Sequence, residues 1–255
     1  MISIITITYN NFDQLVKTLN SIPKSEIVES VVINGGDCKK TKEFLEHYSG
    51  KSISEKDEGI ADAFNTGIKL SSGDYILFLN SGDVLISKDY LNKANSFLDK
   101  NPKIAFVHSN IIFCDQLGAE LFIKPQMKNV GRGMPYNHQT MVVRKKIFDE
   151  VGTFKKQLKY AMDFDLVVRM EKKKLIGYYI NEEAVVKMDG EGISVIREID
   201  SIKECYSVLK SEKYFTLKNM TGYFIRYSLY IIRKLLVQSG GKSILKKLKQ
   251  VKHYR

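Results

Sequence analysis

Short apolar runs alternate with amphipathic segments along the first half of the chain. Residues 75–79 are an unbroken apolar run and residues 2–8 a β-branched run, as found in strands that are buried on both faces, and residues 28–33, which end in Val-Val-Ile, are predicted to form another strand. Between them, apolar residues recur at helical spacing in 12–19 and 60–68. Because strands and helices alternate, the pattern predicts an α/β fold with a mostly parallel central sheet and helices on both faces.

The pattern is less regular in the second half. Residues 104–113 are predicted to form one strand with alternating faces, whereas 114–137 contains several Gly and Pro residues and predicts an irregular loop. A loop of that length in a compact domain is commonly functional. Helical spacing returns in 164–171 and again in 195–210, with a strand within 175–186.

Polar residues follow three of the predicted strands. Tyr9 and Asn10 follow the first, residues 34–37 end the second, and residues 80–83 follow the third apolar run. The carboxyl ends of parallel strands meet at one rim of a sheet, and ligands bind there. The pattern therefore predicts a site for a polar, phosphate-bearing ligand, although Asn-Ser-Gly-Asp at 80–83 is also ordinary turn chemistry.

Charge is unevenly distributed. The net charge of the 255 residues is +11, and the sequence after Glu212 holds eleven Lys and Arg residues and no Asp or Glu, so residues 1–212 are net neutral. The three cysteines share no metal-ligand spacing and are interpreted as structural. We expect no signal peptide, since strand-like sequence begins at residue 2, and no apolar run is long enough to span a bilayer. Neither GxGxxG after the first strand nor a Walker lysine motif occurs.

Six short motifs together give a specific resemblance. The sequence resembles the family 2 glycosyltransferases of the GT-A fold over about residues 2–195, and within them the bacterial polysaccharide branch that includes colanic-acid-type transferases. Members of the family transfer sugars from nucleotide-sugars with inversion at the anomeric carbon. The motifs are TITYN (6–10), VINGG (32–36), DEGIADAFNTGI (57–68), GDY with LNSGD (73–83), HQ (138–139) and DFDL (163–166).

The resemblance implies roles for individual residues. Asp83 matches the last acid of the family's metal motif and implies Mg²⁺ or Mn²⁺, although Asn80 and Gly82 stand where many members have Asp, so we expect the metal to bind together with the donor. Asn34 replaces an Asp that commonly contacts the base. The residues implied to contact the nucleotide-sugar are Thr8, Tyr9, Asn10, Asn34, Asp57, Asn80, Ser81, Gly82, His138 and Gln139.

Asp163 matches the catalytic base of the family. A carboxylate within hydrogen-bond reach of an attacking hydroxyl takes up its proton in the transition state. Met162 stands where the family often has Glu, and Asp165 is the second candidate. Asp165 also suits an i,i+4 ion pair with Arg169, and both acids suit the first turn of a helix without any catalytic role.

The chain divides into a GT-A domain (1–212) and a basic helical extension (213–255). The domain is predicted to have a nucleotide-binding half (about 1–115) and an acceptor half (about 116–212). The extension combines apolar residues at helical spacing with Lys and Arg, which is typical of a helix that lies on an anionic membrane surface. Packing against the core and a solvated tail are the alternatives, and no recognised module supports nucleic-acid binding.

The predicted function is therefore an inverting, metal-dependent glycosyltransferase. It would move a sugar, with a UDP-sugar as the favoured donor, to a hydroxyl of a glycan or lipid-linked acceptor in bacterial surface polysaccharide synthesis. We expect it in the bacterial cytoplasm, peripheral on the cytoplasmic face of the inner membrane. The alternatives are a nucleotidyltransferase-like enzyme and a non-catalytic protein that binds nucleotide or membrane. The sequence leaves the donor sugar, the acceptor, the linkage and the oligomeric state open.

Overall fold

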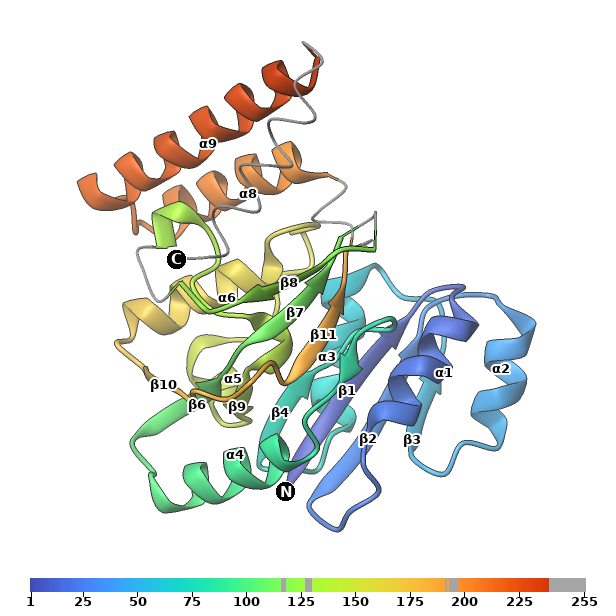
Figure 1. The fold of residues 1–255 in the computed structure, drawn as a ribbon. Coiled ribbons are helices and arrows are strands. Elements are labelled where there is room, and N and C mark those ends of the chain that lie inside the picture. The colour runs from blue at the N-terminus through green and yellow to red at the C-terminus, as the bar shows by residue number, and fades with distance from the viewer. Residues whose placement is uncertain (116–117, 127–129, 191, 193–196, 239–255) are drawn as a thin grey trace.

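A computed structural model describes residues 1–115, 118–126, 130–190, 192 and 197–238. Figure 1 shows a layered α/β body with two helices stacked at one end. The predicted alternation of strand and helix is confirmed over the first hundred residues, where each apolar run of the sequence forms a strand and each amphipathic segment a helix.

Seven strands form the central sheet in the order β10-β6-β9-β4-β1-β2-β3. Strand β9 is antiparallel to its two neighbours, and the other pairs are parallel. The mostly parallel sheet that the sequence predicts is thus confirmed. The strands are β1 (Ile2–Thr8), β2 (Val28–Asn34), β3 (Lys51–Ser54), β4 (Tyr75–Phe78), β6 (Ile104–His108), β9 (Val142–Arg144) and β10 (Ile176–Tyr179).

Helices cover both faces of this sheet because successive strand residues point to opposite sides. On one face, Ile5 packs against α3, where Gly67 leaves room for it: a Cβ at Gly67 would lie 2.4 Å from the Ile5 Cγ2. On the other face, Ile4 belongs to the core cluster of α4. The helices of the body are α1 (Phe12–Ser21), α2 (Lys39–Glu46), α3 (Ile60–Leu70), α4 (Asp89–Lys100), α5 (Ile147–Val151) and α6 (Met162–Lys172).

A second sheet corrects two expectations. It has the order β5-β11-β7-β8 and consists of β5 (Val84–Leu85), β7 (Ile111–Cys114), β8 (Glu120–Ile123) and β11 (Val186–Asp189). The expectation of one strand over 104–113 is wrong, because the chain leaves the central sheet at Ser109 and Asn110 and enters the second as β7. Both residues are buried, and the Asn110 side chain donates to the Glu182 carbonyl at 2.6 Å.

The segment 114–137 is also more ordered than predicted. It contains β8 and the short 3₁₀ helix η1 (Val130–Arg132), and it leads into a second one, η2 (His138–Thr140). Strand β8 pairs antiparallel with β7 along four residues.

The C-terminal helices α8 (Glu198–Ser211) and α9 (Leu217–Gln238) stack beyond α6 (Figure 1). Helix α9 rests on η1, where Gly131 is close enough to the Asn219 backbone that any Cβ would clash with it. Residues 239–255, the last part of the predicted extension, lie outside the described residues. Within the part of the chain that is described, no helix combines the length and the hydropathy needed to cross a bilayer.

His108, at the end of β6, is fully buried among aromatic rings. The rings of Tyr136 and Tyr179 lie 4.7 Å and 5.5 Å from its imidazole, and neither ring nitrogen has a hydrogen-bond partner among the described residues. Burial lowers the pKa of His108 to about 4, because the charged form loses its hydration.

We predict that His108→Phe makes the protein less sensitive to acid. Since the pKa of His108 is lowered on folding, its contribution to stability is complete above the unfolded value near 6.5 and is lost as pH falls towards 4. Between pH 7 and pH 4.5 the wild type should therefore lose about 2 kcal/mol more than the variant in urea unfolding. His47→Phe, at an exposed position, is the control. Equal acid sensitivity of the wild type and His108→Phe would contradict the conclusion that burial lowers the pKa of His108.

Candidate functional site

The carboxyl ends of β1, β2 and β4 meet at one edge of the central sheet, as their parallel pairing requires. Thr8 is in register with Asn34 on β2. The Gly35 N–H donates to the Thr8 carbonyl at 3.1 Å, and the Ser81 N–H donates to the Ile7 carbonyl at 3.3 Å. The loops after three strands, far apart in the sequence, therefore begin side by side.

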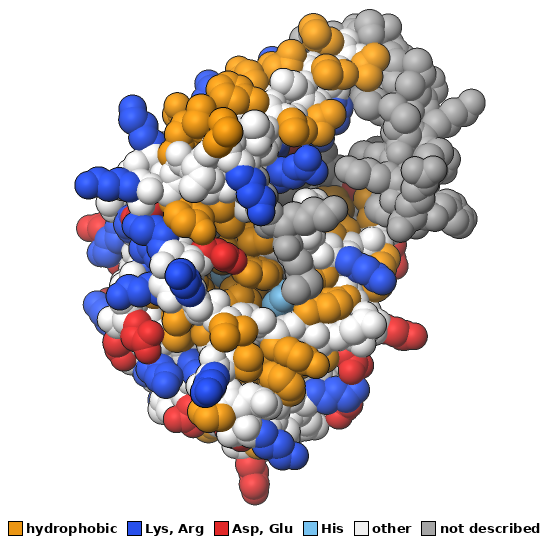
Figure 2. Space-filling model, turned by 90° about the vertical axis from the view of Figure 1, so that its left-hand side faces the viewer, with side chains coloured by type: hydrophobic (Ala, Val, Ile, Leu, Met, Phe, Trp, Pro, Cys, Tyr) orange, Lys and Arg blue, Asp and Glu red, His pale blue; other side chains and the backbone are white. Residues whose placement is uncertain are grey.

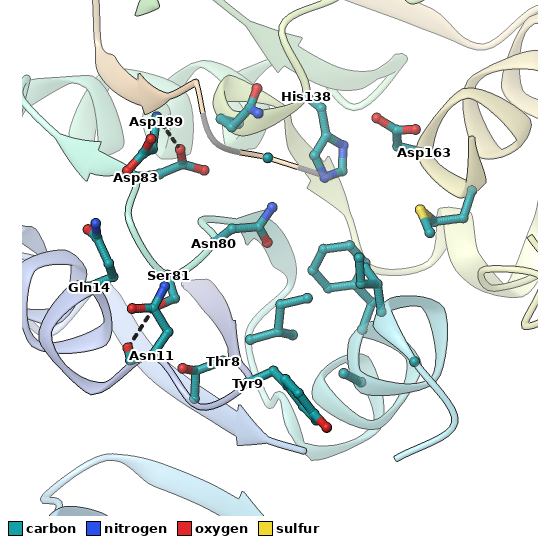
Figure 3. A pocket seen from close by; sticks show the side chains of 18 of the residues that line it. Thr8, Tyr9, Asn11, Gln14, Asn80, Ser81, Asp83, His138, Asp163 and Asp189 are labelled. Atoms are coloured by element: carbon teal, nitrogen blue, oxygen red, sulfur yellow. Dashed lines mark hydrogen bonds between the residues drawn. The ribbon is translucent and has the colours of Figure 1, made fainter. Parts of the chain in front are cut away.

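A cavity of about 640 Å³ opens at this edge (Figure 3). Its volume lies within the range for small-molecule and cofactor sites. One wall comes from the loops after β1 and β4, and the other from η2 and the start of α6. The predicted site residues that line it are Thr8, Tyr9, Asp57, Asn80, Ser81, Asp83, His138, Gln139 and Asp163.

The wall beside β1 carries an exposed ring and a carboxylate. Tyr9 is 71% exposed, so one face of its ring is free to stack on a flat ligand. Asp57 accepts a hydrogen bond from the Gly59 N–H at 2.9 Å. The Asp57 carboxylate occupies the space that a side chain at Gly35 would need, since a Cβ there would lie 1.9 Å from it. Glycine at 35 thus allows Asp57 to reach the cavity.

Three predicted contact residues do not line the cavity. Asn34 is fully buried; its amide N–H groups donate to the Gly36 carbonyl and to Ser54, and its oxygen accepts the Gly36 N–H. The Asn10 oxygen accepts the N–H groups of Asp37 and Cys38 at 2.7 Å and 2.9 Å. Both side chains hold the loop after β2, and neither lines the cavity.

Gly82 is the third. Its φ of 105° is a left-handed conformation that favours glycine, and this shapes the turn before Asp83. A hydroxyl on α1 fastens the same turn, because Thr18 donates to the Asp83 carbonyl at 2.8 Å and accepts the Gly82 N–H at 2.9 Å.

Two carboxylates meet deep in the cavity. Asp83 is only 4% exposed, and its Oδ1 accepts the backbone N–H of Asp189, at the end of β11, at 3.1 Å (Figure 3). Burial raises the pKa of Asp83 to about 7, and the negative charge of Asp189 adds to the rise. A buried Asp83 beside a half-buried Asp189 gains stability from a cation, and carboxylate oxygen is the ligand that Mg²⁺ and Mn²⁺ prefer.

Asp163 and His138 lie on the opposite wall (Figure 3). Asp163 is in the first turn of α6, and its Oδ1 accepts the Phe164 N–H at 2.7 Å. Burial lowers the pKa of His138, and the negative charge of Asp163 opposes that change, so the two groups act on each other. The His138 ring stacks on Phe78 with 5.5 Å between centroids, which fixes its plane.

Asp165 points away from the cavity. It is fully buried, accepts from Arg169 Nε at 2.8 Å and from Lys155 Nζ at 2.7 Å, and does not line the cavity. The predicted i,i+4 pair with Arg169 is confirmed. Asp163 is thus the acid of this pair that faces the cavity.

Several cavity atoms lack the partners that buried polar groups normally have. The Thr8 hydroxyl, the Gln14 and Asn80 side-chain oxygens and His138 Nε2 are buried, and none has a hydrogen-bond partner within the described residues. They belong to both walls of one cavity, so a polar ligand that enters it can satisfy them together.

The sequence did not single out every residue of the cavity. Gln14, Lys159, Tyr160 and Asp189 also line it. Asp189 lies at the end of β11, as Thr8 lies at the end of β1, but the position gives no signal until β11 is known to pair with β5 in the second sheet. Of residues 190–194, which follow Asp189 and include two glycines, the structure describes only Gly190 and Gly192.

The structure is an α/β fold with a cavity at the carboxyl edge of its sheet, where proteins of this architecture bind their ligands. The chain belongs to glycosyl transferase family 2, whose sequence profile matches residues 3–162. Glycosyltransferases of Haemophilus influenzae are similar: one is 24% identical over 200 residues, covering 71% of this chain and 66% of the relative, and another is 26% identical, covering 78% and 86%.

Solved structures show the same GT-A-like fold. Staphylococcus aureus TarS 1–349, in complex with UDP-GlcNAc, superposes with a TM-score of 0.63 at 20% identity over 82% of this chain and 64% of TarS. The mannosyltransferase PcManGT of Pyrobaculum calidifontis, in complex with GDP-Man and Mn²⁺, has a TM-score of 0.63 at 13% identity over 99% of this chain and 83% of its own. The chain spans slightly less than two thirds of TarS 1–349 and of the first Haemophilus relative.

Proposed function

We propose that the protein is an inverting glycosyltransferase that moves a sugar from a nucleotide-sugar to a hydroxyl of a glycan or lipid-linked acceptor. Within the family, we assign it to bacterial surface polysaccharide synthesis, in the colanic-acid-type branch. The observation that supports the proposal most is that Asp83 and Asp163, eighty positions apart, line opposite walls of one cavity. Residues up to about 115 would bind the nucleotide, and those of about 116–212 the acceptor.

Asp163 is the proposed base. An acceptor hydroxyl between the walls would transfer its proton to this carboxylate as its oxygen attacks the anomeric carbon from the side opposite the leaving diphosphate. Attack from that side inverts the configuration. His138 and Gln139, on the same wall, would contact the sugar that is transferred.

Asp163→Asn should lower kcat by about a thousandfold, because an amide does not accept the proton. The donor KM should stay within about twofold, since the nucleotide side of the cavity is unchanged. Initial rates with a UDP-sugar and a lipid-linked acceptor measure both. Asp149→Asn, which changes an exposed acid in the first turn of α5, is the control and should transfer at the wild-type rate. Transfer by Asp163→Asn at the wild-type rate would show that Asp163 is not the catalytic base.

The diphosphate of the donor would lie between Ser81 and the pair of Asp83 and Asp189. The nucleobase of the donor would stack on the Tyr9 ring, with Asp57 at the edge of the nucleobase. We propose a UDP-sugar as donor and Mg²⁺ or Mn²⁺ held by Asp83 and Asp189. No group of three or more His, Cys, Asp or Glu within the described part of the chain is arranged to hold a metal. Two carboxylates bind such an ion weakly, so the phosphates of the donor would complete its ligands. The ion would neutralise the charge that develops on the departing diphosphate.

Asp83→Asn should remove the metal-dependent part of donor binding. With the wild type, UDP-GlcNAc and Mn²⁺ together should raise the melting temperature more than either alone, because a ligand at a hundred times its Kd stabilises a protein by about 2.7 kcal/mol. The variant should lose the Mn²⁺-dependent increase, whereas Asp89→Asn, an exposed acid of α4, should keep it. An increase equal to that of the wild type would exclude Asp83 as a ligand. Screening other nucleotide-sugars in the same way identifies the donor.

Two other functions fit less well. A nucleotidyltransferase needs basic side chains for a triphosphate, and the described residues that line the cavity include four Asp side chains and one basic one, Lys159. A non-catalytic nucleotide-binding protein has no need of Asp163 facing the donor. Donor binding without hydrolysis or transfer to any acceptor would favour it.

We also propose that residues 213–255 bind an anionic membrane surface, which would place the enzyme at the cytoplasmic face of the inner membrane. One face of α9 leaves six large apolar side chains exposed, and Figure 2 shows apolar side chains gathered along the top of the molecule, where this helix lies. Lys218, Arg233 and Lys234 of α9 are also exposed, and Arg233 forms an ion pair with Glu198. Basic residues near an anionic bilayer each contribute about 1 kcal/mol. The exposed apolar side chains are Leu217, Phe224, Ile225, Leu229, Ile232 and Leu235.

Replacing Phe224 and Leu229 together by Ser should weaken membrane binding by tenfold or more, because each buried apolar side chain contributes about 1.5–3 kcal/mol. Sedimentation with vesicles of phosphatidylglycerol and phosphatidylcholine measures it, and vesicles of phosphatidylcholine alone should bind the wild type poorly. Ile176→Ser, which removes a similarly exposed side chain from β10, is the control. If the double variant bound as well as the wild type, α9 would not be the docking face.

A further inference from the structure

Glu204, in the second turn of α8, holds the chain just before α6. Its carboxylate accepts three consecutive backbone N–H groups: those of Lys159 at 3.0 Å, Tyr160 at 2.6 Å and Ala161 at 2.7 Å. Charge-assisted bonds of this length are about twice as strong as neutral ones. A carboxylate from another helix thus binds the whole turn that precedes α6.

This turn needs an external acceptor. Ala161 is the N-cap residue of α6 and has no side chain that could cap the helix, and the N–H groups at a helix start have no partner within the helix. Glu204 accepts the N–H of this N-cap residue and of the two residues before it, whereas an N-cap Ser, Thr, Asp or Asn would accept an N–H two or three residues further along the chain.

The turn also forms part of the cavity. Lys159 and Tyr160 line it, and Asp163 follows Ala161 by two residues. The position and direction of the Asp163 side chain therefore depend on where the first turn of α6 begins. Glu204, on the neighbouring helix α8, holds the start of α6 through its hydrogen bonds to residues 159–161.

We propose that Glu204 is a positioning residue for the transfer reaction: it aligns Asp163 with the acceptor hydroxyl without touching either substrate. The role rests on the proposed function. Glu204 lies on α8, outside residues 3–162 that match the family profile, so the proposal places a residue that orients the catalytic base in a part of the chain that the profile does not cover. A misplacement of about 1 Å at a reacting group lowers rates by about a hundredfold.

Glu204→Ala and Glu204→Gln test the proposal in graded form. Ala removes all three bonds. Gln keeps an oxygen for the N–H groups of Tyr160 and Ala161 but sets an NH₂ against the Lys159 N–H. We expect kcat to fall about a hundredfold in Glu204→Ala and about tenfold in Glu204→Gln. The donor KM should stay within about twofold, since β1 and β4 form that side of the cavity. Lys203→Ala, the exposed neighbour on α8, should behave as the wild type.

Hydrogen exchange gives a second readout that does not require activity. The amides of 159–161 should exchange at least tenfold faster in Glu204→Ala than in the wild type, with those of β1 and β4 unchanged. Unchanged kcat in both variants, or unchanged exchange at 159–161, would overturn the positioning role of Glu204. Neither result would contradict the proposed glycosyltransferase function. Loss of donor binding together with kcat would show a general structural role instead. A wild type that neither transfers nor hydrolyses any nucleotide-sugar would contradict the proposed function itself.

Discussion

The parallel pairing of β1 between β2 and β4 is the constraint on which the site depends. Its register places Thr8 beside Asn34 and brings the Ser81 N–H to the Ile7 carbonyl, so three loops start from one edge. Side-chain hydrogen bonds then hold the loops. The buried Thr18 hydroxyl donates to the Asp83 carbonyl, and the exposed Asn10 side chain accepts an N–H of the loop after β2. The sheet thus fixes where the loops begin, and these hydrogen bonds fix the course that the loops take.

The opposite wall is positioned by charge. Asp165 is buried and bound by Arg169 and Lys155, and Lys155 also pairs with Glu212 at the end of α8. Successive residues of a helix are about 100° apart, so with Asp165 turned into this network Asp163 faces almost the opposite way, into the cavity. A buried carboxylate without any cationic partner costs about 3–5 kcal/mol. This cost keeps α6 in one rotational setting, and that setting aims Asp163.

The sequence predicts the half of the structure that depends on local pattern. The strands before Tyr9 and Asn80 are apolar runs with polar ends, and their convergence follows from the rule for parallel sheets. The pattern does not distinguish a side chain that lines a cavity from one that braces it, so Asn34, expected to face the base, lies fully buried behind the wall. Nor does it show a change of sheet at Ser109, or the approach of Asp189 and Glu204 to the site from elements late in the chain. Those contacts are set by packing between distant segments.

The unpaired polar atoms of the cavity suggest how the site balances stability against binding. Each unsatisfied buried group costs about 1–3 kcal/mol, and Asp83 adds a carboxylate whose charge is disfavoured by burial. The aromatic rings beside the cavity pack closely: Phe64 lies on Phe78 with ring centroids 4.6 Å apart, and His138 stacks on Phe78. A ligand that satisfies these groups recovers their cost as binding free energy. These groups, which have no partner among the described residues, therefore favour a ligand with hydroxyls and phosphates that reach them.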